Sequence, residues 1–240
     1  KTIPGLCGCG IADTDSDDDG ELDCKETDDD NDGLADEEEQ GPSGDDPNYD
    51  GNDDGIADSL QDNVASFHTY DDQSYVTMES PVGTSISSCK AVDNPSPTNS
   101  PSSNEFSYGF FEFKITGVGN GDVTTVILHF PVGATFDTYY KYGPTPSNDI
   151  DHWYEFLNDG QTGAEINGNV ITLHFVDGKK GDDDLTANGI AIDIGGPAVS
   201  LNPGGGGGGS DDGGGTSGDG GGGGGGGGCF IGTVVNNLEW

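Results

Sequence analysis

Two complete calcium-loop patterns within the first 39 residues constrain the fold of this chain more than any other feature. Each reads Asp-x-Asp-x-Asp-Gly-x5-Glu, first from Asp15 to Glu26 and again from Asp28 to Glu39. Alternate positions of such a loop direct side-chain oxygens inward, the glycine permits a sharp bend, the next residue offers its carbonyl, and the glutamate closes the shell. This all-oxygen shell suits the hard cation Ca²⁺. The expected ligands of the two loops are Asp15, Asp17, Asp19, the Glu21 carbonyl, Asp23, Glu26, Asp28, Asp30, Asp32, the Leu34 carbonyl, Asp36 and Glu39.

A third, incomplete copy of the pattern follows. Its expected ligands are Asp50, Asn52, Asp54, the Ile56 carbonyl and Asp58. Gln61 stands where the closing glutamate is expected, so we expect weaker calcium binding here. Acidic runs are usually solvated and disordered. The spacing argues against that interpretation, because glycine follows the third ligand and an acid returns at the ninth position in all three copies.

The loops leave no room for the flanking helices of an EF-hand. Residues 4–10 are rich in glycine and proline, and only Thr27 separates Glu26 from Asp28. The loops therefore follow one another almost end to end. Residues 5–62 resemble thrombospondin type 3 repeats, whose Asp-rich segments wind around strings of calcium ions, and the Cys7-Gly8-Cys9-Gly10 stretch is similar to bacterial versions. The spacer 40–48 and Gln61 depart from that pattern, and a dockerin-like pair of loops is the alternative, although it too would need helices.

The acidic composition argues against two classes of partner, nucleic acids and anionic membranes. The chain has 45 acidic residues against seven lysines and no arginine, a net charge of −38, and 23 of the acids lie in the first 62 residues. Nucleic acids and anionic membranes are bound through clusters of Lys and Arg, so the first is excluded and the second is disfavoured. Without cations the N-terminal quarter would repel itself and bury too little apolar surface to fold. We therefore expect calcium binding and folding of this segment to be one process.

Calcium affinity and cysteines both favour a secreted protein. Extracellular calcium modules work with dissociation constants of roughly 10⁻⁴ to 10⁻³ M. A disulfide from Cys24 to Cys7 or Cys9 would staple the first loop, with Cys89 a candidate partner for the remaining cysteine and Cys229 left over. Zinc is disfavoured because Cys7 and Cys9 lack the usual two-residue gap and no histidine is near. Neither a signal peptide nor a membrane span is evident, and we expect a mature or trimmed fragment.

Residues 64–200 have the pattern of an all-β sandwich, with β-branched and aromatic runs between turn residues. The segment 94–101 is expected to be an exposed loop. The expected strands are 65–70, 75–80, 85–91, 108–116, 123–130, 135–142, 152–157, 170–176 and 189–194.

This region also resembles a bacterial domain family. The stretches 139–144, 153–156, 182–189 and 195–198 are similar in order and spacing to the choice-of-anchor U domain. That resemblance implies a surface protein whose homologues end in different anchoring tails, and it implies no catalytic residues. Aromatic residues of these stretches are expected to be core or cross-strand pairs, with a sugar-stacking platform as the alternative. They are Tyr139, Tyr140, Tyr142, Trp153 and Tyr154.

An acidic loop within this region has two interpretations. Asp177, Asp182, Asp183 and Asp184 crowd it together with Lys179 and Lys180. The carboxylates favour a further calcium site, whereas the lysines favour a solvated turn with local ion pairs.

The C-terminal part divides into a glycine-rich tether, residues 201–228, and a β-prone segment, residues 229–240. The terminal segment is a candidate for strand donation to an adjacent subunit, which would produce a homo-oligomer or filament.

Enzymatic activity is the least supported class. The four histidines are scattered, and no nucleophile elbow, P-loop or paired metal-hydrolase motif is present, so we expect no enzyme. The sequence favours a calcium-binding extracellular structural protein of the bacterial cell surface, with filament assembly through its tail. The alternative is a surface-displayed adhesin or carbohydrate-binding module with a glycan or cell-envelope partner.

Overall fold

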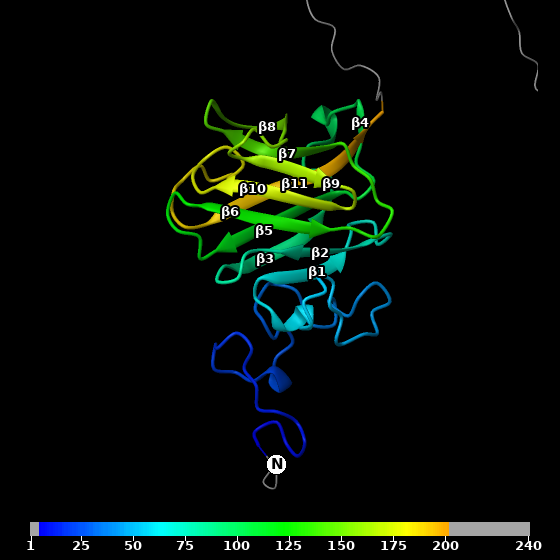
Figure 1. The fold of residues 1–240 in the computed structure, drawn as a ribbon, viewed down its shortest axis with the longest axis vertical. Helices are drawn as coiled ribbons and strands as arrows, with labels where there is room; N and C mark the ends of the chain where they lie inside the picture. The colour runs from blue at the N-terminus through cyan, green and yellow to red at the C-terminus, as the bar shows by residue number, and fades with distance from the viewer. Residues whose placement is uncertain (1–4, 202–240) are drawn as a thin grey trace, which may run out of the picture. The chain divides into compact units, whose positions relative to one another are not determined.

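A computed structural model describes residues 5–201, which fold into two antiparallel β-sheets preceded by irregular loops (Figure 1). The expected all-β class is confirmed. The described residues belong to one compact unit. The expected tether and terminal strand therefore lie outside the described residues, and strand donation stays a prediction.

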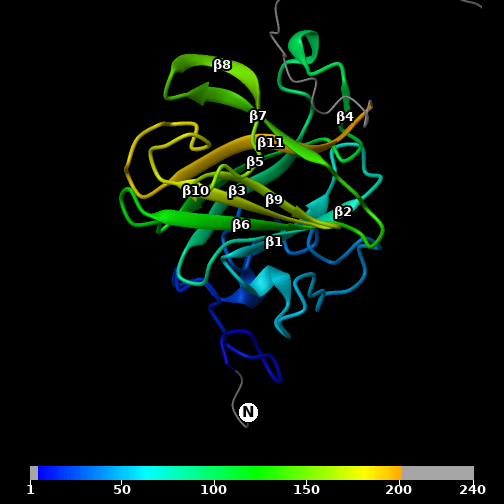
Figure 2. The same cartoon turned by 45° about the horizontal axis from the view of Figure 1, so that its top comes forward.

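Each sheet has antiparallel neighbours throughout. The first has the order β1 (Val64–His68), β2 (Tyr75–Glu79), β6 (Val123–His129), β10 (Val170–Val176) and β9 (Gly163–Asn167). The second has the order β3 (Ser85–Val92), β5 (Phe110–Thr116), β11 (Ala191–Ser200), β7 (Thr138–Thr145) and β8 (Asn148–Glu155), with β4 (Asn104–Glu105) on the end of β11. The turned view separates β6, β9 and β10 of the first sheet from β7, β8 and β11 of the second (Figure 2).

Alternation of apolar residues explains why the two sheets pack together. On β5, Phe111, Phe113 and Ile115 occupy alternate positions, so their side chains share one face, and all three are buried. They meet apolar side chains of the first sheet, and the rings of Phe113 and Phe175 lie 6.1 Å apart. One hydrophobic core thus fills the space between the sheets.

The predicted strands largely coincide with observed ones, and two strands were not predicted. β4 is two polar residues long, and β9 has only Ala164 and Ile166 as alternating apolar residues, a run too short to stand out in the sequence. β8 begins at Asn148, before the predicted start at 152, because hairpin pairing with β7 extends it through a polar stretch. The expected loop 94–101 holds a 3₁₀ turn at Pro97–Asn99. Among the described residues, no helix is long and apolar enough to cross a membrane.

Leu34 anchors the second calcium loop to the sandwich. Its side chain is 7% exposed and belongs to the core cluster, which extends from the sheets into the N-terminal loops. The adjacent Gly33 lies so close to β3 that an added Cβ would be 3.3 Å from Ser88 Cα. The second loop therefore packs on the sandwich through apolar contact as well as through polar groups.

Leu34→Ala is expected to lower the free energy of unfolding in calcium by about 2–3 kcal/mol, because it leaves a cavity in the core. Chemical denaturation measures this. Ile56→Ala is the matched control, since Ile56 holds the same loop position in the third copy but is 50% exposed. Equal effects of the two substitutions would contradict the anchoring role of Leu34.

Candidate calcium sites

All three loops adopt the same backbone conformation. The fourth residue of each has a positive φ, at 60° in Asp18, 55° in Asn31 and 63° in Asp53. The sixth residue is a glycine with a φ of 93° to 99° in each copy. Glycine adopts this conformation without the steric cost that a side chain would add. The repeated sequence pattern is therefore a repeated structure.

The ninth residue closes each loop. Its N–H donates to the carbonyl that precedes the loop, from Asp23 to Thr14 at 3.1 Å, from Asp36 to Thr27 at 3.0 Å and from Asp58 to Tyr49 at 2.8 Å. Its carboxylate in turn accepts a hydrogen bond from the N–H of the second residue in every copy. The seventh residue donates its N–H to the fifth side chain in all three loops. These bonds fix the loops without flanking α-helices, and the first and third loops each hold a short 3₁₀ helix, at Asp23–Lys25 and Asp58–Leu60.

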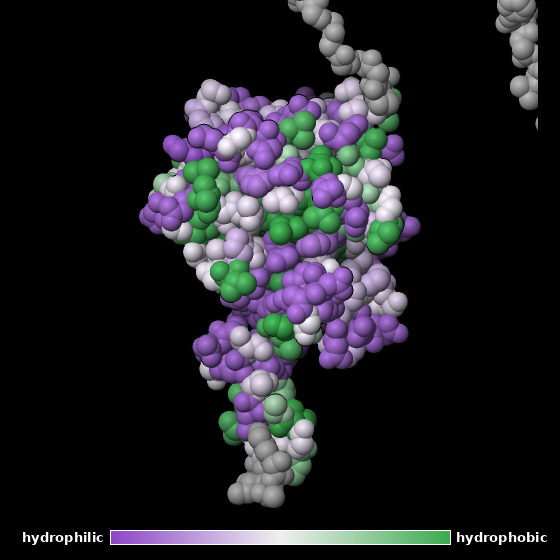
Figure 3. All heavy atoms as spheres, in the orientation of Figure 1, coloured by the Kyte–Doolittle hydropathy of each residue, from purple (hydrophilic) through white to green (hydrophobic). Residues whose placement is uncertain are grey.

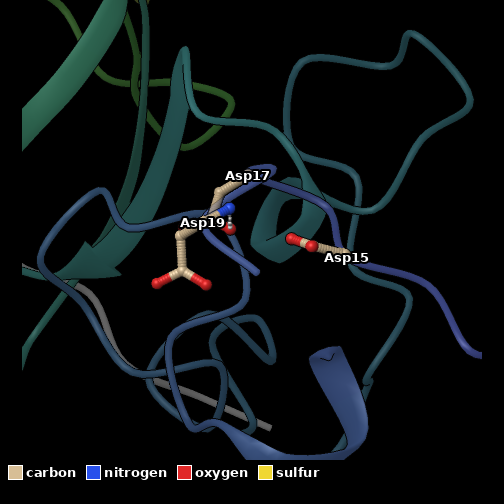
Figure 4. Close-up of side chains that lie close together, drawn as sticks. All are labelled: Asp15, Asp17 and Asp19. Atoms are coloured by element: carbon tan, nitrogen blue, oxygen red, sulfur yellow. Dashed lines mark hydrogen bonds between the residues drawn. The ribbon is translucent and has the colours of Figure 1, made fainter. Parts of the chain in front are cut away.

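The first loop brings Asp15, Asp17 and Asp19 together. One carboxylate oxygen from each lies within 4.8 Å of the other two. The three side chains project from one turn of the chain, in which the Asp19 N–H donates to Asp17 Oδ1 (Figure 4). Asp15 Oδ1 is buried and has no hydrogen-bond partner. Three converging oxygens suit a hard cation.

Glu26, the expected closing ligand of the first loop, belongs to a different group. It converges with Asp23 and Asp29 within the same 4.8 Å limit. Asp29 was not predicted as a ligand. Burial raises its pKa to about 7, and the charges of Asp36 and Asp23 add to that rise. The signal that could have found Asp29 is its position, three residues after Glu26 ends the first loop and second in the next loop.

The second loop carries the most buried carboxylates of the three. Asp28, Asp30 and Asp32 converge within 4.8 Å. Asp30 is 2% exposed, Asp32 is 0% exposed and the expected closing ligand Glu39 is 2% exposed. Burial is the main cause that raises their pKa values, to about 7 for Asp30, about 8 for Asp32 and about 10 for Glu39, and their mutual repulsion adds to it. The three charges are therefore poorly tolerated by the protein alone.

No cationic side chain compensates for this cluster. Among residues 5–201, no Lys or His forms an ion pair with Asp30, Asp32 or Glu39. Asp32 Oδ2 is fully buried and lacks a hydrogen-bond partner. Buried charges in proteins are paired or coordinate metals. The residues present therefore fit a divalent cation, which would be held by Asp28, Asp30 and Asp32, whereas the expected ligand Glu39 does not belong to this converging group.

The Asp-rich loops, residues 5–62, form an N-terminal arm whose end is joined to β1 through hydrogen bonds. Glu39 Oε1 accepts a hydrogen bond from the Ser66 N–H at 2.8 Å, and Asp58 Oδ2 accepts one from the Ser66 hydroxyl. Asp30 Oδ2 accepts one from the Gln61 N–H at 3.0 Å. On the face shown in Figure 3, hydrophilic residues gather where the loops adjoin the sandwich. The order of the second loop is thus coupled to the first sheet.

In the third loop, the Gln61 side chain bonds to oxygens that a cation would otherwise bind. Its side-chain amide nitrogen donates to Asp54 Oδ1 and to the Ile56 carbonyl, both at 3.4 Å. These are two of the expected ligand atoms. Asp58, another, is fully buried and accepts bonds from the Gly51 N–H and from Ser66. The geometry agrees with weaker binding at this copy.

Gln61→Glu is expected to raise the calcium affinity of the third loop by about tenfold or more, because it adds a charged closing ligand. Calcium titration calorimetry of the variant and its parent measures the change. Gln161→Glu adds the same charge at an exposed position outside the loops and is the control. A gain no larger than that of Gln161→Glu would contradict the role assigned to position 61.

The cysteines are only partly arranged as expected. Cys7 and Cys24 form a disulfide with a Cα–Cα distance of 5.8 Å, which staples the first loop as one of the two predicted alternatives. The candidate pairing of Cys89 with the remaining cysteine is wrong. Cys89 is a free cysteine buried in the core, whereas Cys9 is exposed. Cys229 lies outside the described residues.

Hydrogen bonds from backbone N–H groups to its carboxylates hold the acidic loop at 177–184 in place. Asp177 Oδ2 accepts from the Gly121 and Gly189 N–H groups at 2.7 and 3.0 Å, and Asp182 accepts from Gly178 and Ile192. Asp183 pairs with Lys141. Among the described residues, these acids do not form a group of three converging carboxylates. Neither a calcium site nor a solvated turn describes this loop.

The five aromatic residues considered as a platform divide between two faces of the second sheet. Tyr139 is fully buried and Tyr154 packs on Phe156, so both face the core. Tyr142 and Trp153 pair on the opposite face with ring centroids 5.1 Å apart. The Trp153 indole N–H donates to the Ser96 carbonyl at 3.1 Å. A platform of all five residues does not form.

Comparisons with protein families, characterised proteins and solved structures found no match to this chain. The resemblances to thrombospondin type 3 repeats and to a choice-of-anchor domain therefore rest on the sequence motifs alone.

Proposed function

We propose that this protein is a secreted structural protein of the cell surface, in which calcium ions fold and stiffen an N-terminal arm joined to a β-sandwich. The observation that carries the proposal is the buried cluster of Asp30, Asp32 and Glu39, which has raised pKa values and no cationic partner among the described residues. Such a cluster is stable at neutral pH when a divalent cation neutralises it. The calcium therefore has a structural role.

The chain's cysteine chemistry supports placement outside the cytoplasm. Cys7 and Cys24 are at disulfide distance, and disulfides persist in oxidising compartments. Calcium is plentiful in the same environments. The arm would then be stabilised by calcium after export and less stable wherever free calcium is scarce.

Calcium titration calorimetry on the full chain, stripped of metal beforehand, tests this function. We expect dissociation constants of about 10⁻⁴ to 10⁻³ M, as in extracellular modules, with a heat-capacity change that reports coupled folding. Magnesium at equal concentration is the control. Absence of calcium binding in this range, or no preference over magnesium, would refute the proposal.

Assembly into a filament is a further part of the proposal that depends on residues outside the described range. Electron microscopy of the full chain in millimolar calcium tests it. Polymers that disappear on chelation are expected. Dispersed monomers would remove self-assembly from the proposal and leave the calcium-dependent arm standing.

A further inference from the structure

A buried lysine, a buried carboxylate and a largely buried one meet between the sheets, far from the N-terminal loops in sequence. Lys141 of β7 is 0% exposed, and its Nζ contacts Asp193 Oδ1 of β11, which is also 0% exposed. Asp183 Oδ1 lies 3.3 Å from the same Nζ. An amine and a carboxylate that are both fully buried are unusual in a core, because dehydrating charged groups is costly.

Strand register brings the amine and the carboxylate together. Lys141 pairs with Gly195 across the β7–β11 ladder, so Asp193, two residues earlier, is its diagonal neighbour on the same face. Asp183 is held beside them by two backbone bonds. Its N–H donates to the Ile192 carbonyl at 3.0 Å, and its Oδ2 accepts from the Ile194 N–H at 3.1 Å.

A glycine makes room for the third group. A Cβ at Gly143 would lie 2.5 Å from Asp183 Oδ1. Any side chain at this position of β7 would push Asp183 away from Lys141. The cluster is therefore a built pocket and not a chance contact of long side chains.

Aromatic rings enclose the amine. The centroids of Phe156 and Phe175 are 5.6 and 5.5 Å from Lys141 Nζ. The Tyr139 hydroxyl donates to Asp193 Oδ2 at 3.1 Å, which leaves Asp193 held at both oxygens. Burial lowers the pKa of the Lys141 ammonium and raises the pKa of Asp183 to about 6, although each of this pair partly offsets the shift of the other. Burial thus shifts Nζ toward the neutral amine, the form whose lone pair can attack a carboxyl carbon.

We propose that Lys141 and Asp193 react with each other to form an intramolecular amide bond that covalently joins β7 to β11. The Nζ lone pair attacks Asp193 Cγ, a C–N bond forms, and one C–O bond breaks. Written from the neutral amine and the protonated Asp193 carboxyl group, Nζ loses one proton, the hydroxyl oxygen of Asp193 gains that proton and leaves as water, and the carboxyl carbon keeps its oxidation state. One amine and one carboxylic acid therefore give one amide and one water, and no further reactant is required.

Two polar side chains and two aromatic rings around the reacting pair have roles in this step. Asp183 touches the nucleophile and takes the proton from Nζ, then returns it to the departing oxygen. Tyr139 donates to the carboxyl oxygen on which negative charge develops during the attack. The rings of Phe156 and Phe175 exclude the water that would reverse the reaction.

The bond would suit a protein that works outside the cell. β7 and β11 are central neighbours of the second sheet, so a covalent bridge between them prevents their separation when the chain is pulled or partly unfolded. This crosslink is independent of calcium. Its success or failure therefore leaves the proposed calcium function untouched.

Intact mass spectrometry of the purified, disulfide-reduced full chain tests the proposal. The expected mass is that of the sequence less one water molecule. After trypsin digestion, which does not cleave after an acylated lysine, we expect a branched peptide that joins residues 115–179 to residues 181–240. Fragmentation should place the branch at Lys141 and Asp193. A mass equal to that of the sequence, with cleavage after Lys141, would overturn the proposal without recourse to any variant.

Variants identify the reacting groups. Lys141→Met and Asp193→Ala should each abolish the loss of water, and Asp183→Asn should reduce the crosslinked fraction at least about tenfold while both reacting residues remain. Lys90 and Glu112 form the matched control, since they are an ion pair at 3.2 Å on the same sheet with side chains 59% and 45% exposed. A branch at Lys90 would show that proximity alone suffices, and an undiminished crosslink in Asp183→Asn would overturn the proton-transfer role.

Discussion

Asp32→Asn is expected to shift the stability of the protein in opposite directions with and without calcium. In a chelator the variant should be more stable, because it removes a fully buried carboxylate whose pKa is raised to about 8 by burial and by the charge of Asp30. Asparagine keeps the oxygen that accepts the Leu34 N–H at 2.7 Å. In calcium the variant loses a charged ligand, and its affinity should fall by about a hundredfold, or ~2.7 kcal/mol.

Urea denaturation at about pH 8 in EDTA, and again over a series of calcium concentrations, measures both effects. Asp45→Asn is the matched control, because it removes the same charge from an exposed position in the same arm. If Asp32→Asn were less stable than its parent in EDTA, the Asp32 carboxylate would not destabilise the metal-free protein. That result would remove the physical reason for a cation at the second loop.

The free energy of unfolding in chelator is expected to fall as the pH rises from about 4 to about 8. Asp30, Asp32 and Glu39 have folded-state pKa values of about 7, 8 and 10, above the ordinary values of 3.8 and 4.5 that they regain on unfolding. Between these limits the folded state binds more protons than the unfolded state, so stability decreases with pH. Each group contributes up to about 1.4 kcal/mol per pH unit, and the loss amounts to several kcal/mol in total.

Calcium should reverse this dependence. The cation binds the ionised carboxylates and displaces their protons, so the stabilisation by calcium grows as the pH rises. Denaturation at about pH 5 and about pH 8, with and without calcium, measures these two opposite pH dependences of the free energy of unfolding. Asp32→Asn should flatten the curve in chelator. A metal-free protein that gains stability between pH 5 and pH 8 would contradict the assigned pKa shifts.

The three calcium loops were predictable because their determinants are local. Alternate acids, a glycine at the sixth position and an acid at the ninth fix a turn whose closing hydrogen bonds, from the ninth residue and to it, fall within one repeat or next to it. The strands were likewise predictable wherever apolar residues alternate, as on β5 and β10. The short strand β9, with only two alternating apolar residues, became visible only through its pairing with β10.

The features that sequence could not supply depend on contacts between distant residues. Leu34 was expected only as a carbonyl ligand, and its side chain proved to be part of the core because β3 lies next to the second loop. Lys141 and Asp193 are 52 residues apart, and only the register of β7 on β11 brings them together. Cys89 was a disulfide candidate by count, but its inward position on β3 places it in the core. In each case the sequence alone did not reveal which side chains are buried or which residues the strand register brings together.

A crystal structure of the full chain grown in millimolar calcium, with anomalous scattering recorded to identify the ion, tests the central claim most directly. We expect a calcium ion in the second loop with six to eight oxygen ligands at about 2.3–2.6 Å, among them Asp28, Asp30, Asp32, the Leu34 carbonyl and Glu39. A second loop without an anomalous peak, in which Asp32 and Glu39 are protonated and hydrogen-bonded to each other, would contradict the account.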